Sequence, residues 1–285
     1  MTNNVIGDEQ RETYSREGYL ILRNAFDPSR IRSLVEAVNW LIDRALAGQV
    51  TIPWIGQPSQ RTPERLSNLL DPGRYHPAYA AWLEEDLIPL VESLLKSPVR
   101  HSLFGMLAGG GGKPYLQAWH HDLPNPSNPS DPAVIVNPEP FWFTQFNAPL
   151  QPHDQFLQIV PGSHNRPAST AEKEAFQRDC KGDMPGQLTV AMEPGDIAFY
   201  NANLWHRGYN PKGQLRWTMH TAMWRCDFPV MTHEAGQRES LLSAGHLDQM
   251  PPRTRAALQA YLDAYPAGEP PGPAELLRQR STAHH

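Results

Sequence analysis

The sequence predicts a mainly β fold with flanking helices, arranged as a double-sheet barrel or jelly roll. Two amphipathic helical patterns come first, before residue 96. From His101 onward they give way to short runs rich in aromatic and β-branched residues, which are typical of strands. Proline and glycine separate these runs. The 29 prolines and 20 glycines among 285 residues favour ordered loops between strands over a helical bundle.

The helical part begins with a predicted helix end and strand over Tyr14–Arg23. Asp27 and Pro28 then have the residue types of a helix N-cap and first turn. Apolar residues recur every three or four positions from Ile31 to Leu46, and Gly48 follows as a terminator. A second such pattern covers Pro77–Leu95. Both helices are predicted to pack against the sheets. The aperiodic stretch Thr51–Arg74 is predicted to be a long loop that lines a site.

The strand part contains eight predicted strands divided by turns. The strands are 101–107, 113–122, 133–137, 141–148, 156–160, 188–192, 197–200 and 214–225. The clearest turns are four consecutive glycines at 109–112, Pro-Gly-Ser-His at 161–164 and Pro-Gly-Asp at 194–196. Short helices are predicted at 171–181, 255–265 and 274–280, the last two divided by a Gly-Pro-rich break at 268–272.

No linker divides the chain, so one domain is predicted over residues 1–285. It has a helical N-terminal part at about 14–95, a β core at about 100–226 and a helical C-terminal tail at about 237–285.

Composition excludes several classes of partner. The formal charge is −5, from 25 basic and 30 acidic residues, and no basic run favours nucleic acid or an anionic membrane. No apolar run is long enough to span a membrane. The polar, acidic start and the presence of only two cysteines, Cys180 and Cys226, predict a cytoplasmic protein without a disulfide framework. The oligomeric state and the identity of the substrate stay open.

A metal site is predicted around His120-His121-Asp122. On an extended strand, side chains two residues apart share one face, so His120 and Asp122 can converge on one ion while His121 points away. His206 is the best candidate for a third ligand. Two histidines and one carboxylate form the facial triad of non-haem Fe(II) oxygenases, which leaves the other positions of the metal open.

Arg216 adds an anion-binding group to this metal site. Its predicted strand carries bulky side chains on both faces, so the arginine is expected to be buried. A buried guanidinium needs a buried anion, and its planar fork binds a carboxylate through two hydrogen bonds. A cosubstrate that carries a carboxylate fits this requirement.

These landmarks follow one another in a particular order. His120 and Asp122 come first, then Pro161–His164, then Gly195-Asp196, and finally His206 and Arg216. This order resembles that of the phytanoyl-CoA dioxygenase family. The resemblance covers roughly residues 14–224. It implies a double-stranded β-helix of the jelly-roll, cupin-like type, with Fe(II) held by His120, Asp122 and His206. It implies that 2-oxoglutarate chelates the metal and that Arg216 binds its far carboxylate. Dioxygen then oxidises a small-molecule substrate, with release of succinate and CO2.

The resemblance also bears on neighbouring positions. His164 belongs to a turn and is not expected to bind metal. In related halogenases a small residue replaces the carboxylate ligand, so Asp122 favours hydroxylation or another oxidation. Gly208 stands where a hydroxyl residue that assists the cosubstrate is common, and Thr144 stands where an aromatic residue is common. Gln117 and Thr144 are therefore candidate contacts of 2-oxoglutarate.

Two other classes of function compete with the oxygenase. One is a non-oxidative cupin-type metalloenzyme, which would hold zinc or manganese in the same triad and would not need Arg216. The other is a catalytically silent barrel that binds a small molecule, although such a barrel need not keep all four residues. Acyl-CoA is disfavoured as substrate because no basic cluster matches its phosphates. The four glycines lack the lysine and helix of a phosphate-binding P-loop.

Overall fold

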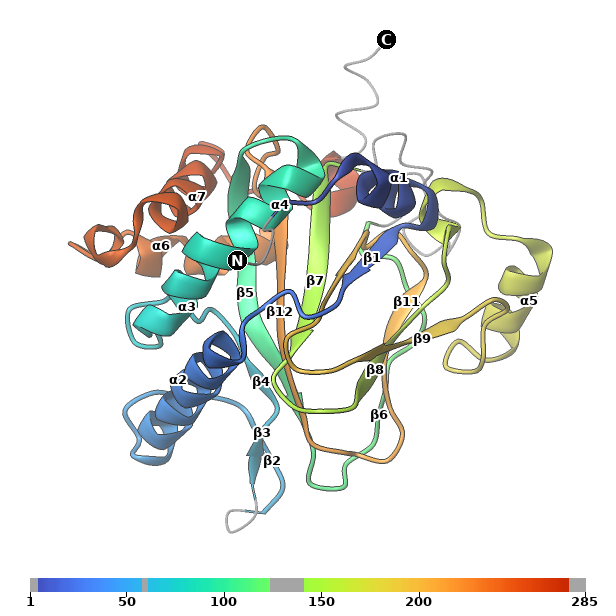
Figure 1. Cartoon of the computed structure of the whole chain (residues 1–285), viewed down its shortest axis with the longest axis horizontal. Coiled ribbons are helices and arrows are strands. Elements are labelled where there is room, and N and C mark those ends of the chain that lie inside the picture. The colour runs from blue at the N-terminus through green and yellow to red at the C-terminus, as the bar shows by residue number, and fades with distance from the viewer. Residues whose placement is uncertain (1–4, 58–60, 124–140, 277–285) are drawn as a thin grey trace.

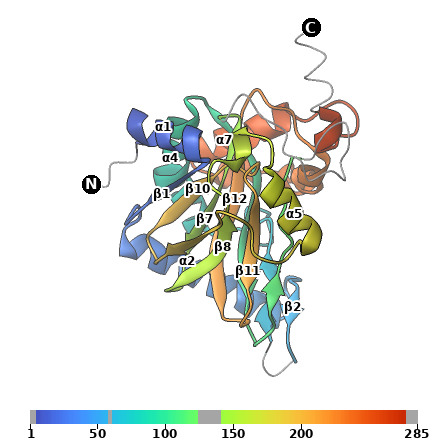
Figure 2. The ribbon, with the colours of Figure 1, turned by 90° about the vertical axis from the view of Figure 1, so that its right-hand side faces the viewer.

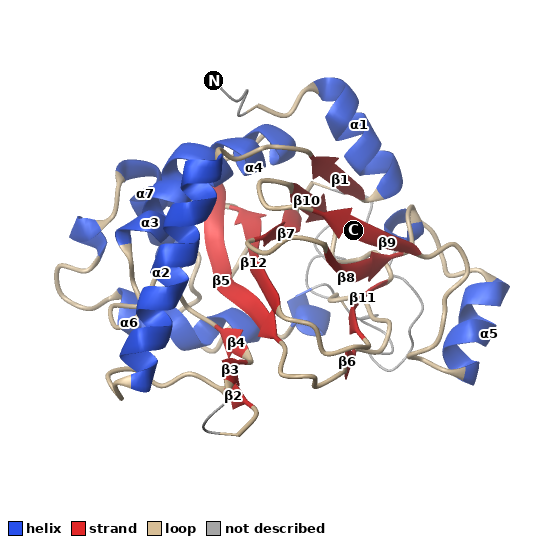
Figure 3. Ribbon diagram, turned by 60° about the horizontal axis from the view of Figure 1, so that its bottom comes forward, coloured by secondary structure: helices blue, strands red, loops and turns tan. Residues whose placement is uncertain are grey.

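Two antiparallel β-sheets pack together in the computed structural model, which describes residues 5–57, 61–123 and 141–276 (Figure 1). Helices cover the outer face of the larger sheet (Figure 3). The main core lies between that sheet and the helices, and a second apolar cluster lies under the smaller sheet. The predicted jelly-roll arrangement of mainly β structure with flanking helices is confirmed.

The larger sheet has the strand order β1-β10-β7-β12-β5-β4. In that order the strands are Tyr19–Leu22, Ile197–Tyr200, Phe143–Pro149, Arg216–Arg225, Val99–Gly109 and Arg65–Leu66. The smaller sheet, in the order β6-β11-β8-β9, contains Tyr115–Leu116, His206–Asn210, Asp154–Ile159 and Leu188–Met192 (Figure 2). A separate pair joins β2 (Trp54–Ile55) to β3 (Thr62–Pro63).

Helices precede, interrupt and follow the strands. They are α1 (Asp8–Glu17), α2 (Pro28–Leu46), α3 (Pro77–Trp82), α4 (Ile88–Leu95), α5 (Thr170–Arg178), α6 (Arg238–Leu241) and α7 (Pro252–Asp263). A π-helical turn, η1 (Leu83–Leu87), joins α3 to α4, and 3₁₀ turns occur at η2 (Ser163–Asn165), η3 (Thr232–Gln237) and η4 (Leu247–Gln249). Among the described residues, no helix combines the length and the apolar character needed to cross a bilayer.

Local chemistry explains the two long helical segments. The Asp27 side chain accepts a hydrogen bond from the Ser29 backbone N–H at 2.8 Å, and Pro28 occupies the first turn of α2, as predicted. The second segment is continuous but contains the π-helical turn. Pro89 is the second residue after that turn. Because proline lacks an N–H and crowds the carbonyl four residues earlier, it disfavours regular α-helix there.

Several sequence-based boundaries need correction. The stretch 51–74 was predicted to be a loop, but it contains β2, β3 and β4. The predicted strand 113–122 is regular only at Tyr115–Leu116, because the Trp119 N–H bonds to Cys180 beside α5 and so leaves the ladder with β11. The predicted strand at 133–137 and the final part of the helix at 274–280 lie outside the described residues.

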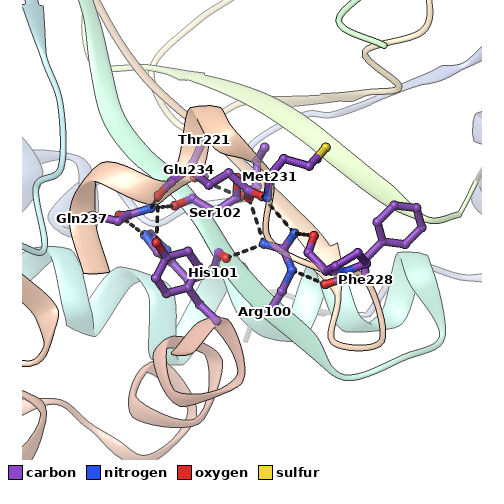
Figure 4. Close-up of polar contacts among 11 residues, drawn as sticks. Arg100, His101, Ser102, Thr221, Phe228, Met231, Glu234 and Gln237 are labelled. Carbon is purple, nitrogen blue, oxygen red and sulfur yellow. Dashed lines mark hydrogen bonds and ion pairs between the residues drawn. The ribbon is translucent and has the colours of Figure 1, made fainter. Parts of the chain in front are cut away.

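A buried ion pair fixes the segment after β12 to β5. Arg100 bonds to both carboxylate oxygens of Glu234 at 2.8 and 3.0 Å, and neither side chain is exposed (Figure 4). Arg100 also donates to the carbonyl oxygens of His101, Phe228 and Pro229. A fully bonded pair of this kind resists separation, since removing one partner leaves an uncompensated buried charge. The ion pair holds η3 in place, and His233 of η3 lines a cavity between the two sheets.

Candidate active site

The two histidines of the predicted triad lie opposite each other in an isolated β-bridge. The backbone N–H of His120 donates to the carbonyl of His206, and the reverse bond is also formed, both at 3.1 Å. This pairing puts the imidazoles side by side, with ring centroids 4.2 Å apart. One ligand comes from the loop after β6 and the other begins β11, so the contact depends on the fold and not on sequence proximity.

Asp122 completes the cluster. Its Oδ1 lies 3.5 Å from His120 Nε2 and 3.6 Å from His206 Nε2, and the three ligand atoms all lie within 4.8 Å of one another. Metal–ligand bonds of about 2.0–2.2 Å put adjacent ligand atoms about 3 Å apart. The donor set and its spacing therefore fit a metal ion after a small contraction.

Hydrogen bonds hold both imidazoles in the form that binds metal. The Nδ1 atoms of His120 and His206 each lie 2.9 Å from a backbone carbonyl oxygen, of Ala118 and Leu204 respectively. Donation from Nδ1–H leaves the Nε2 lone pair free to coordinate. Burial lowers the pKa of His206 to about 4, so its imidazole is neutral near pH 7.

Gln145 was missed by the sequence analysis. Its side-chain amide donates to Asp122 Oδ2 from β7, leaving Oδ1 directed toward the two histidines. Thr144, the residue predicted to lie near the cosubstrate, does not line the cavity. Its hydroxyl instead donates to backbone oxygens of Gln145 and Tyr200. Side chains alternate along a strand, so Gln145 and Asn147 face the cavity while Thr144 faces the other way.

Gln117 lies next to the candidate metal ligands. Its Oε1 accepts a hydrogen bond from the Gly208 N–H at 3.1 Å, which directs its Nε2 to within 3.3 Å of His120 Nε2. Packing requires glycine at position 208, because a Cβ there would lie 2.6 Å from the Tyr115 ring and 3.3 Å from Gln117 Oε1. Tyr115 and Gln117 therefore occupy the space of the hydroxyl residue expected at position 208.

Arg216 begins β12, is only 5% exposed and faces the same cavity. Its Nε–H donates to the Thr218 hydroxyl at 3.0 Å, and that hydroxyl donates to Asp154. The Phe156 ring lies 5.4 Å from the guanidinium carbon. Burial lowers the pKa of Arg216, while Asp154 opposes this shift. In the described chain the two Nη groups have no hydrogen-bond partner, so they remain available to a ligand.

The two other histidines that the sequence raised lie outside the triad. His121 stacks on Trp205, with ring centroids 4.0 Å apart, and its Nδ1 lies 2.8 Å from the Asn203 carbonyl. His164 lies in η2 and contacts the Ser15 carbonyl through Nε2 at 3.0 Å. Both therefore have packing roles.

The triad, Gln117 and Arg216 all line one cavity of about 660 Å³. Its walls come from both sheets, and the wall on β7 and β12 includes His220, Phe143 and Trp224. Burial lowers the pKa of His220 to about 3, and the Asn147 side-chain oxygen lies 2.9 Å from its Nδ1. A cavity of this size accepts a small molecule.

Comparisons with known proteins agree with this architecture. The crystal structure of AviO1 from Streptomyces viridochromogenes Tue57 has a TM-score of 0.58 and 19% identity, over 78% of this chain and 96% of that one. EctD from S. alaskensis with 2-oxoglutarate and 5-hydroxyectoine has a TM-score of 0.56 and 20% identity, over 79% of each chain. HygX from Streptomyces hygroscopicus with nickel and 2-oxoglutarate bound has a TM-score of 0.57 and 16% identity, over 80% and 90%. At these identities the likeness shows a shared fold.

No curated protein matches the chain by sequence. The sequence pattern of the phytanoyl-CoA dioxygenase family, in contrast, matches residues 14–214, which is more than half of the chain. The matched region includes all three residues of the candidate metal triad. The protein therefore belongs to the phytanoyl-CoA dioxygenase (PhyH) family, whose members are Fe(II)- and 2-oxoglutarate-dependent dioxygenases.

Proposed function

We propose that this protein is an active Fe(II)- and 2-oxoglutarate-dependent dioxygenase that hydroxylates or otherwise oxidises a small-molecule substrate. The observation that carries the proposal is the presence, in one cavity, of a two-histidine, one-carboxylate donor set and a buried arginine with free Nη groups. A three-ligand site leaves positions open for a chelating cosubstrate and for dioxygen. EctD and HygX, which share the fold, have been crystallised with 2-oxoglutarate.

The side chains of the site have separate roles in this proposal. His120, Asp122 and His206 hold the metal, and Gln145 orients Asp122. Arg216 binds the far carboxylate of 2-oxoglutarate in a bidentate manner, with its Nε already fixed by Thr218. When bound, iron with 2-oxoglutarate and dioxygen supplies the oxidising chemistry and releases succinate and CO2.

Gln117 is the proposed second contact of the cosubstrate. Its amide nitrogen Nε2 lies 3.3 Å from His120 Nε2. A metal would be bound by the lone pair of that histidine nitrogen. Metal binding would therefore free one amide N–H for a neighbouring ligand oxygen. Thr144 is not proposed for this role, because its hydroxyl is directed to backbone oxygens away from the cavity.

The test is an anaerobic titration of the purified protein with Fe(II) and 2-oxoglutarate. We expect the weak visible charge-transfer band that such complexes give, and we expect succinate to form when air is admitted. His206→Ala is the matched negative control, because it removes one ligand from the cluster. Binding of zinc or manganese with neither the band nor succinate would instead support the non-oxidative cupin-type enzyme. Loss of all metal binding would support a silent binding barrel.

A further inference from the structure

A second arginine faces the cavity from the edge of the larger sheet. Arg65 lies on β4 and pairs with Leu107 of β5, and residues paired across two strands lie on the same face. Both residues line the cavity, and Arg65 is exposed. Gly105 allows this placement, because a Cβ there would lie 2.4 Å from the Leu66 carbonyl oxygen and would push β4 away.

The charge of Arg65 reaches the interior of the site. His220, on β12, has a pKa lowered first by burial and next by Arg65. Arg65 lines the same cavity as the candidate metal cluster. In the described chain it forms no hydrogen bond, ion pair or ring contact of its own.

The other charged groups on the cavity wall already have a partner or a place in the proposed chemistry. Lys113 lies 3.8 Å from the Glu64 carboxylate. Arg207 lies between two aromatic rings and donates from Nε to the Gln158 side chain at 2.8 Å. Asp122 belongs to the metal cluster and Arg216 to the proposed cosubstrate site. Arg65 is therefore a cation on the cavity wall that has no anionic partner, either among the described residues or in the proposed chemistry.

We propose that Arg65 binds a carboxylate of the molecule that is oxidised, so that the substrate is a small organic acid. This inference rests on the proposed function, because it treats 2-oxoglutarate as the ligand of Arg216. A guanidinium without a partner in a partly enclosed cavity prefers a carboxylate, which it can contact through two parallel hydrogen bonds. With its acid end at β4, a substrate would direct its other end along Phe143 and Trp224 or toward the metal.

The test compares acids with their neutral amides on the anaerobic Fe(II) protein saturated with 2-oxoglutarate. The probes are phenylacetate and phenylacetamide, 3-phenylpropionate and its amide, and hexanoate and hexanamide, with affinities measured by calorimetry. The wild type should prefer at least one acid over its amide by about tenfold or more, which is the effect of one hydrogen bond to a charged group. Arg65→Gln should abolish that preference, and Arg65→Lys should retain part of it.

Arg61→Gln is the matched control, since Arg61 lies on the same segment but stacks on Trp54 and does not line the cavity. It should leave the preference unchanged. The proposal is overturned if no acid is preferred by the wild type, including the case in which no probe binds. It is also overturned if the preference survives Arg65→Gln, or if the acids compete with 2-oxoglutarate.

The affinity for 2-oxoglutarate separates this inference from the proposed function. Arg65→Gln should change that affinity by less than about threefold, whereas Arg216→Ala should weaken it strongly. Equal weakening by both variants would place Arg65 in the cosubstrate site and overturn its assignment to the substrate. A wild-type protein that binds no 2-oxoglutarate at all would contradict the proposed function. The acid preference at Arg65 would then still be measured on the metal-loaded protein alone.

Discussion

Arg216→Ala should raise the apparent KM for 2-oxoglutarate steeply while iron affinity changes little. The guanidinium is only 5% exposed, its Nε–H is fixed on Thr218, and its Nη groups face the cavity. Truncating one partner of a desolvated, hydrogen-bonded charge pair costs about 2–5 kcal/mol. That range corresponds to roughly thirtyfold to several thousandfold in affinity. The Arg216→Ala variant should still retain iron, because Arg216 is not among the three clustered candidate ligands.

A graded series gives the measurement its controls. Arg216→Lys should recover only part of the affinity, since an ammonium cannot make the two-pronged contact. Thr218→Val keeps the guanidinium but removes the acceptor of its Nε–H, so it should give a smaller increase in KM than Arg216→Ala. A 2-oxo acid without a far carboxylate, such as pyruvate, should not distinguish Arg216→Ala from the wild type. Equal KM values for 2-oxoglutarate under matched Fe(II) would refute this role of Arg216.

Three further predictions concern the metal, the oxidation outcome and stability. His120→Ala and His206→Ala should each abolish iron retention and succinate formation, and metal analysis showing full occupancy would move the site elsewhere. Asp122→Gly should stop oxygenation and open a position for chloride, whereas an undiminished hydroxylation rate would mean that the carboxylate does not bind metal. Glu234→Ala should lower the free energy of unfolding by about 3–5 kcal/mol in urea melts, because it strands a buried arginine. An unchanged midpoint would contradict this.

A fifth prediction concerns acid. Burial lowers the pKa of His101 to about 4, although its hydrogen bond to Gln237 raises it. In the unfolded chain His101 binds a proton near pH 6.5, whereas in the folded protein it stays neutral until about pH 4. The free energy of unfolding therefore falls as the pH drops from about 6.5 toward 4, by up to about 3 kcal/mol. His101→Phe should make the pH dependence of the unfolding free energy less steep in that window. Identical slopes for variant and wild type would show that His101 is not the source.

Local chemistry determined much of the secondary structure. The Asp27-Pro28 start of α2 and the strands 188–192 and 197–200 are where the sequence placed them, because caps, turns and period-two patterns act within a few residues. Strand β11 was not predicted. Its residues His206 to Asn210 show no alternation of apolar and polar side chains, and pairing with β8 and β6 is what extends them. The ladder expected over 113–122 breaks at Trp119, whose N–H bonds to a distant carbonyl.

For the site, the sequence by itself supplied the candidate donors, and only the tertiary structure determined what surrounds them. His120, Asp122, His206 and Arg216 could be named because their residue types and order define a chemistry. Gln145 and Asp154 could not, because each bonds to a residue distant along the chain. Arg65 could not, because only the fold brings it to the same cavity. The choice of Gln145 over Thr144 rests on strand register, since one residue reverses the direction of a side chain. Register is set by pairing with neighbouring strands, which no local pattern in this sequence specifies.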